Sequence, residues 1–590
     1  MAQIVGGRVI IVPQAVSQID DSALAALNSP GSGAIGALGV TDGGNPGEVV
    51  SFTSAAEARS VLRGGRLLDV IERMYSPSAQ VQGAYTVRVA RVAGTGVARS
   101  SRNIGAATPQ MALVSRDFGA WTNQIRFKIE VGTRGYKATI ANDQGTFTQD
   151  NLYRAVINLL YTGAAATCTA AVTATGITID SATAAEDATF TFAAYPTLAL
   201  MVNAINASAS NVRATCVHAD SLGAPSYWLD VIAPTDVRQT TAPNGLTATQ
   251  NTVALLEWFN QSALGIKAIQ SGVNPEAATL GATSNPGATS TWLVTAFSYL
   301  VGGSDGGVPT VSDWQTAFDL LKAADAQIIM PASEDPAIHA MADAHCQVMS
   351  DIVNKGERIA FVGGGNDTDS IAAIAAKAQA LNSARTVFAY PGLRVFGADG
   401  QVVTVGPMHT AAALAGMAAG VAVGEPLTNK TVRAQSVSRP LNRADVETLL
   451  TSGVAVVELR RNRGPVVVQS VTTWQNDRKY TNREMSVRRT ADFIVRTLRE
   501  GVEDLIGGQN GPDLLVQVVS RANSILKDLE RSRIIVGDAA SPAFRGIQAR
   551  AEGETVYLDI TCSPVLPANY IVLTAHLAPY SGSRTAVGAN

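Results

Sequence analysis

The sequence predicts a multidomain protein of the α/β and α+β classes, with an inserted β-rich region and extended chain ends. Strands and helices alternate between residues 302 and 390, which is typical of βαβ units that build a small parallel sheet. The composition changes after about residue 100, and residues 167–290 are rich in Ala and Thr and poor in charge, with short β-branched runs. The remaining C-terminal part mixes hairpin-like strands with helices. We therefore expect one or more domains inserted into a larger one.

The N-terminal region predicts an arm followed by the first core elements. Residues 8–12 are extended, and a Ser-, Asp-, Asn- and Pro-rich stretch follows. Ser54 is placed to cap the first of two helices, because its side chain can accept a hydrogen bond from a free N–H of the first turn. The expected elements are strand 34–40, helices 55–62 and 67–75, and strand 85–92.

The remaining elements follow from hydrophobic spacing. In the insertion we expect strands within 172–179 and 189–192 and helices 196–207 and 252–263. The βαβ region predicts helices 312–323, 336–354 and 367–381 and strands 327–330, 358–362 and 386–390. The Ala- and Gly-rich stretch 410–424 predicts a closely packed, buried helix. Further on we expect a helix from the Asn442 cap to 450, a hairpin of 454–459 and 465–471, helix 486–505, and strands 544–551, 555–562 and 570–577.

Composition excludes several classes of protein. The chain has 590 residues, 46% of them hydrophobic and only 16% charged, with a net charge of −3. Binding to nucleic acid or to a membrane surface would favour a basic excess. The apolar run 410–424 is too short to cross a bilayer, and the N-terminal run of four apolar residues is too short for a secretory signal. Four scattered cysteines indicate neither a disulfide framework nor a zinc site.

Two glycine-containing segments only partly match phosphate-binding loops. Residues 424–431 resemble GxxxxGK[ST], but Asn429 replaces the second glycine. Residues 363–367 lie between a strand and a helix, but the third glycine of GxGxxG is replaced by Thr368. We interpret the first segment as an ordinary loop and the second as a turn capped by Asn366 or Asp367, with nucleotide binding as the alternative.

One helix carries potential metal ligands. His339, Asp343 and Cys346 share a helical face, and His345 is adjacent. The flanking residues are small and apolar, and no second cluster accompanies them, so we interpret this face as a polar helix edge. The other histidines are isolated, and hydrolase or metalloprotease motifs are absent from the sequence. We predict no catalytic, cofactor or metal site, and a protein that is not an enzyme.

A basic stretch stands out against the nearly neutral chain. Residues 458–499 contain ten basic and four acidic side chains, a local net charge of +6. A solvated surface explains this pattern, and so does contact with an acidic partner. Sparse aromatic residues make nucleic acid a poorer explanation. The candidate contact residues are Arg478, Lys479, Arg483, Arg488, Arg489 and Arg496.

The order of motifs along the chain resembles the contractile tail sheath proteins of bacteriophages and related injection systems. Near the start the motifs are GAIGALGVTDGGNPGEVV (33–50), SAAEARSVLRGGRLLDVIERMY (54–75) and GAYTVRVARV (83–92). In the middle they are FSYLVGGSDG (297–306), IIMPASED (328–335), RIAFVGG (358–364) and FAYPGLRV (388–395). Near the end they are residues 441–474, SVRRTADFIVRTLRE (486–500) and residues 557–577. The resemblance covers about 1–95 and 297–577.

This resemblance implies a core domain built from both chain ends, with variable domains inserted into it that face outward. The implied boundaries are an N-terminal arm at 1–20, core at 21–99 and 297–568, insertion at 100–296 and a C-terminal strand or arm at 569–590. The arms are implied to add strands to sheets of neighbouring subunits. The expected linking residues are Ile4, Val5, Val9, Ile10, Ile11, Tyr570, Ile571, Val572 and Leu573.

The resemblance also implies a function. Subunits would stack as hexameric rings around a tail tube, and contraction would drive the tube through the host envelope. The implied partners are other copies of the chain, the tail tube protein, and baseplate and tail terminator proteins, without nucleic acid or membrane insertion. The implied location is the virion tail sheath, after assembly in the host bacterial cytoplasm. A bacteriocin or other injection-system sheath is the alternative, and a nucleotide-binding α/β enzyme is the rival class.

Overall fold

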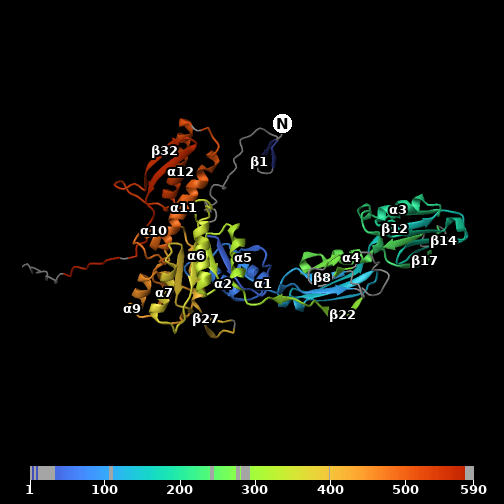
Figure 1. The fold of residues 1–590 in the computed structure, drawn as a ribbon, viewed down its shortest axis with the longest axis horizontal. Helices are drawn as coiled ribbons and strands as arrows, with labels where there is room; N and C mark the ends of the chain where they lie inside the picture. Colours follow the sequence, from blue (N-terminus) through green and yellow to red (C-terminus); the bar gives the residue numbers. More distant parts are fainter. Residues whose placement is uncertain are drawn as a thin grey trace, which may run out of the picture.

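The computed structural model describes residues 3–5, 8–10, 33–104, 111–238, 245–270, 272–273, 279–280, 293–397, 399–509, 511–569 and 571–577. It confirms a mixed α/β multidomain fold. Figure 1 shows a central body, a β-rich region that extends to one side, and a C-terminal unit that rises from the body. The elements of these three parts come from different stretches of the sequence.

The central body is built on an eight-stranded sheet with strands from both parts of the chain. The strand order is β31-β30-β26-β25-β24-β3-β5-β4. Strands β30, β26, β25, β24, β3 and β5 are parallel, whereas β31 and β4 pair antiparallel at the two edges. The bounds are β3 Ile35–Gly39, β4 Val49–Phe52, β5 Val87–Arg91, β24 Ile328–Pro331, β25 Ile359–Gly363, β26 Thr386–Tyr390, β30 Val454–Arg460 and β31 Gly464–Val467. Because β24 pairs directly with β3, segments almost 300 residues apart share one sheet.

Helices cover both faces of this sheet, and each face has its own hydrophobic core. Helices α2 (Arg66–Tyr75) and α8 (Pro407–Gly420) pack on one face, with α1 (Ala55–Leu62) beside them. Helices α5 (Val311–Lys322), α6 (Pro336–Met349), α7 (Ile371–Leu381) and α9 (Arg443–Thr451) contribute side chains to the core of the other face. Successive residues of a strand point alternately into the two cores. Ile328 and Met330 face α2 and α8, and Ile329 faces the opposite way.

Helix α8 confirms the predicted buried helix, and its small residues explain how it fits. Every residue from Pro407 to Ala419 is buried. A Cβ atom at Gly416 would collide with the carbonyl oxygen of Met74, and one at Gly420 with that of Gln82. Glycine at these positions lets the backbones of α8, α2 and the following loop approach closely.

The β-rich region contains two further cores. One is formed by β7 (Ser101–Ile104), β8 (Met111–Ser115), β9 (Arg126–Val131), β10 (Tyr136–Asn142), β11 (Gly145–Leu152), α4 (Asn251–Phe259), β19 (Ile266–Gln270) and β22 (Val294–Tyr299). The second is nested within it and contains β12 (Ala155–Tyr161), β13 (Cys168–Val172), β14 (Gly176–Ser181), β15 (Ala188–Thr191), α3 (Leu198–Ala207), β16 (Val212–Cys216), β17 (Ile232–Asp236) and β18 (Leu246–Thr249). The short pair β6 (Val97–Ala98) and β23 (Ser304–Asp305) joins the two connections to the body.

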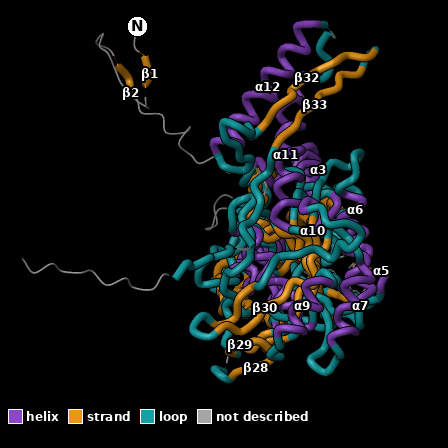
Figure 2. The backbone as a smooth tube through the Cα atoms, turned by 90° about the vertical axis from the view of Figure 1, so that its left-hand side faces the viewer, coloured by secondary structure: helices purple, strands orange, loops and turns teal. Residues whose placement is uncertain are grey.

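A small three-stranded sheet lies at one end of the body. It contains β27 (Leu393–Phe396), β28 (Val402–Val405) and β29 (Ser436–Val437). Figure 2 shows β28 and β29 at the end of the molecule opposite the C-terminal unit.

The C-terminal unit consists of α10 (Tyr480–Arg483), α11 (Met485–Val502), α12 (Pro512–Arg531), β32 (Phe544–Glu552) and β33 (Thr555–Cys562). Its core includes Ile494 of α11 and Leu526 and Leu529 of α12. Helix α12 was not predicted from the sequence, although Val518, Ala522, Leu526 and Leu529 form a buried stripe with helical spacing.

Candidate assembly surfaces

The N-terminal linking residues lie on two short paired strands. Strands β1 (Gln3–Val5) and β2 (Arg8–Ile10) are antiparallel, with Ile4 opposite Val9. Both strands are in a sheet of two, so each has an edge without a partner among the described residues. Ile11 and Tyr570 lie outside the described residues.

The C-terminal linking residues do not form the strand that we expected. Residues 571–577 have no regular secondary structure, and Ile571, Val572 and Leu573 are 90%, 88% and 89% exposed. The predicted strand 570–577 is therefore wrong for the isolated chain. The physical reason is that a strand needs a partner for its backbone N–H and C=O groups, and the described part of this chain supplies none there.

A two-stranded sheet in the C-terminal unit has open edges. Strands β32 and β33 pair only with each other among the described residues. Alternate residues of both strands are partly buried, and α12 packs against the hairpin, chiefly against β32. An open edge presents unpaired backbone donors and acceptors, the feature that allows a further strand to be added.

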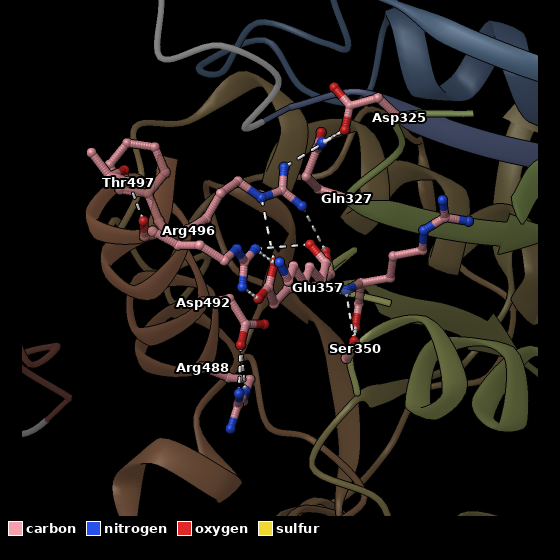
Figure 3. A network of polar contacts seen from close by, with 12 residues as sticks. Asp325, Gln327, Ser350, Glu357, Arg488, Asp492, Arg496 and Thr497 are labelled. Atoms are coloured by element: carbon pink, nitrogen blue, oxygen red, sulfur yellow. Dashed lines mark hydrogen bonds and ion pairs between the residues drawn. The ribbon is translucent and has the colours of Figure 1, made fainter. Parts of the chain in front are cut away.

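Part of the basic stretch forms an internal network rather than a surface. Figure 3 shows Asp492 of α11 beside Arg488 and close to Glu357. Arg385, at the start of β26, donates from Nη1 and Nη2 to the two carboxylate oxygens of Asp492 at 2.8 and 3.2 Å. The side chains of Arg385 and Asp492 are only 14% and 13% exposed. Arg488 donates to the same carboxylate from the preceding turn of α11.

Glu357 forms the second half of this network. It precedes β25, and its side chain is 9% exposed. Arg499 donates to its two carboxylate oxygens at 2.7 and 2.9 Å, and Nε of Arg496 lies 3.5 Å from Oε2. Burial is the largest single influence and would raise the pKa of Glu357. The hydrogen bonds to this carboxylate and the charges of Arg499 and Arg496 together outweigh it, so the pKa lies below its usual value. Helix α11 is thus tied to the central sheet through two carboxylates.

The structure divides the six candidate contact residues into two groups. Arg489 is buried and donates to the carbonyl oxygen of Ala418 at 2.5 Å, and burial lowers its pKa to about 10. Arg488 forms an ion pair with Asp492, and Arg496 forms one with Glu357. The interpretation of Arg489 as a contact residue is corrected, because its side chain is buried. Contact of the partly exposed Arg488 and Arg496 with a partner stays a prediction. Arg478 and Lys479 are exposed and Arg483 is partly exposed, so these remain candidates.

At Gly363 the end of β25 packs against the start of a neighbouring helix, α8. A Cβ atom at Gly363 would collide with the carbonyl oxygen of Pro407, the first residue of α8. Asp367 accepts a hydrogen bond from the Ser438 hydroxyl at 2.8 Å. The cap of α7 is Ser370, which accepts from the N–H of Ala373, so the predicted cap at Asn366 or Asp367 is wrong. The turn glycine serves close packing rather than a phosphate cradle.

The histidine-bearing face of α6 is buried, so its interpretation as a polar edge is also wrong. His339, Asp343, His345 and Cys346 are all at most 7% exposed. The Thr386 hydroxyl donates to Asp343 at 2.7 Å, and Nε2 of His345 lies 2.7 Å from Nη1 of Arg358. Burial raises the pKa of the Cys346 thiol. Burial, together with the charge of Arg358, lowers the pKa of His345 to about 4.

This arrangement predicts loss of stability in mild acid. Because His345 has a folded pKa of about 4 and an ordinary pKa of 6.5, the unfolded chain binds the proton first as the pH falls. The free energy of unfolding should therefore decrease by about 2 kcal/mol between pH 7 and pH 5 through this group. Hydrogen-exchange protection of α6 amides, corrected for the intrinsic effect of pH on exchange, should depend less on pH in His345→Gln than in the unaltered chain. His218→Gln, at an exposed position, is the matched control and should keep the full dependence.

The described residues group no three His, Cys, Asp or Glu side chains so that they could hold a metal ion. A search of the same residues for a helix long and apolar enough to cross a membrane also finds none.

The fold of this chain is the fold seen in a solved sheath tail protein. The structure matches the sheath tail protein from Desulfitobacterium hafniense with a TM-score of 0.53 and 13% identity, over 94% of this chain and 96% of that one. Residues 307–473 match the phage tail sheath protein central domain.

Sequence comparison gives the family. The chain is 30% identical to the tail sheath protein of Bacillus phage SP01, over 98% of this chain and 97% of that protein. It is 23% identical to the tail sheath protein of Staphylococcus phage Twort, over 89% of both chains. The chain therefore belongs to the phage tail sheath protein family.

Proposed function

We propose that the chain polymerises as stacked hexameric rings around a tail tube, and that contraction of this sheath drives the tube through the host cell envelope. The observation that carries the proposal is the match along almost the whole chain to a phage tail sheath protein. A structural role, without catalysis, agrees with the close packing of Gly363 against the start of α8. The phage origin of the relatives favours a phage tail over a bacteriocin-type device.

We infer that strand addition joins the subunits. Strands β1 and β2 with Ile4, Val5, Val9 and Ile10, and the exposed segment with Ile571, Val572 and Leu573, would pair with open sheet edges of neighbouring copies. The open edges of β32 and β33 support this inference. Main-chain hydrogen bonds would hold such a link while the subunits rotate as rigid bodies during contraction.

We also propose an orientation for the parts. Residues 21–99 and 297–568 form the core towards the tube, 100–296 face outward, and 1–20 and 569–590 are the arms. The shared eight-stranded sheet supports the split core. Arg478, Lys479 and Arg483 are candidate contacts with the tube or a neighbour. Baseplate and tail terminator proteins would bind the two ends of the sheath, which assembles in the host cytoplasm without nucleic acid or membrane insertion.

Negative-stain electron microscopy of the purified chain tests the proposal. We expect tubes of regular helical appearance, because the energy for assembly lies in the packing of identical subunits. A chain that stays monomeric at every concentration and ionic strength, and whose melting temperature rises with a nucleotide, would contradict it in favour of the enzyme alternative.

A further inference from the structure

A basic groove lies at the β27–β29 end of the body. It has a volume of about 770 Å³ and is bordered by the end of α2, strand β27, residues 431–435 and the turn between β30 and β31. Three arginines line it, Arg73, Arg433 and Arg463, whereas the described lining residues include no carboxylate. Phe396 provides an apolar wall and is 58% exposed.

Neutral acceptors hold these arginines in place. Arg463 donates from Nη1 to Oδ1 of Asn429 at 2.6 Å and from Nη2 to its carbonyl oxygen at 2.9 Å. Arg433 donates to the Ser76 hydroxyl, and Arg73 to the carbonyl oxygen of Arg433 at 3.3 Å. Glu72, the carboxylate nearest in sequence, is paired with Arg59 at 2.6 Å. The groove therefore presents oriented guanidinium groups whose charge is not neutralised by its own walls, which suits an acidic ligand.

The same chain carries a surface of complementary charge. The connection that runs from the last turn of α11 through the loop to the first turn of α12 covers the described residues 500–509 and 511–513, and it contains Glu500, Glu503, Asp504 and Asp513 and no basic residue. All four acidic residues are exposed, although Asp504 also pairs with Arg521 at 3.1 Å. Ile506 lies between them in sequence and is 77% exposed. We call this connection the acidic tip.

The acidic tip and the basic groove lie at opposite ends of the molecule. Figure 1 shows α12 above the central body and β27 at the lower side of the body, and Figure 2 shows the same separation for α12 and β28. The tip therefore cannot fill the groove of its own chain. A contact between unlike surfaces of two copies is heterologous, and such contacts generate closed rings or open helical filaments.

We infer that the acidic tip of one copy docks in the basic groove of another copy, with Ile506 against Phe396 and the carboxylates beside Arg433 and Arg463. The inference rests on the proposed self-assembly and adds a side-chain contact to the backbone links between strands. Protein–protein interfaces usually have an apolar centre surrounded by polar and charged residues. Opposite charges would also set the direction in which copies add.

Charge exchange between two variants tests this contact. The groove variant carries Arg433→Glu and Arg463→Glu, and the tip variant carries Glu500→Lys and Glu503→Lys. Each variant alone should form no tubes at low ionic strength, because like charges face each other. An equal mixture should form tubes again, because each tip then meets a groove of opposite charge. A control with Arg213→Glu and Lys267→Glu, exposed residues of the β-rich region, should assemble as the unaltered chain does.

The outcomes separate this contact from the proposed function. Tubes from the groove variant alone, or an equal mixture that still forms none, would overturn the tip–groove contact and leave the sheath function standing. Failure of the unaltered chain to form tubes counts against the sheath function instead. In that case sedimentation velocity still measures the contact: the mixture should form complexes that neither variant forms alone, and monomers throughout would overturn it.

Discussion

Removal of residues 1–15 is expected to leave a folded, monomeric chain that cannot form tubes. The eight-stranded sheet begins at β3, and the described core clusters contain no residue before Ile35, so the truncation spares the cores. It removes both β1 and β2, and with them the main-chain donors and acceptors that would pair with a neighbouring copy. Circular dichroism should be close to that of the full chain, and microscopy should show no tubes.

A substitution within the arm separates backbone pairing from side-chain effects. Val9→Pro removes one N–H from β2, and proline is poorly tolerated within paired strands, so we expect assembly to weaken strongly. Val9→Thr is the matched control, because threonine keeps the N–H and the β-branched shape. Normal tubes from the truncated chain would show that the arm is not a link. Equal loss in both Val9 variants would point to the side chain.

Local signals predicted much of the fold because their partners lie within a few residues. Ser54 and Asn442 cap their helices as predicted: Ser54 accepts from the N–H of Glu57, and Asn442 accepts from that of Asp445, with which it also forms a capping box. The parallel strands were readable because both faces are covered and their residues are uniformly apolar. Helix α12, which the sequence analysis did not predict, had an equally clear signal: Pro512 at its first turn and apolar residues at helical spacing after it.

The errors concern contacts between distant parts of the chain. The sequence predicted a cap at Asn366 or Asp367, but Ser370 caps α7 and Asp367 instead accepts from the distant Ser438. The face of α6 with His345 looks polar, but Arg358 lies against it and buries it. The spacing of basic residues in α11 could not show that Arg499 pairs with Glu357, which lies more than 130 residues earlier in the chain. Whether residues 571–577 form a strand depends on a partner strand, which the described part of this chain does not supply.

The docking of α11 should depend strongly on Asp492. In Asp492→Ala, Arg385 and Arg488 lose their shared carboxylate, and Arg385 is left as a largely buried, unpaired cation. Loss of one partner of a buried ion pair costs about 3 kcal/mol, because the remaining charge stays desolvated. Since α11 joins the unit with β32 and β33 to the body, its loosening should also weaken assembly.

Hydrogen exchange is the appropriate measurement, because a chain with several cores does not unfold in one step. A cost of about 3 kcal/mol corresponds to about a hundredfold faster exchange of α11 amides, if these exchange through local opening. Asp528→Ala is the matched control: Asp528 pairs with Arg531 on α12, but both side chains are more than half exposed, so its loss should change exchange little. Unchanged protection of α11 in Asp492→Ala would mean that apolar packing at Ile494, rather than the ion pairs, holds the helix in place.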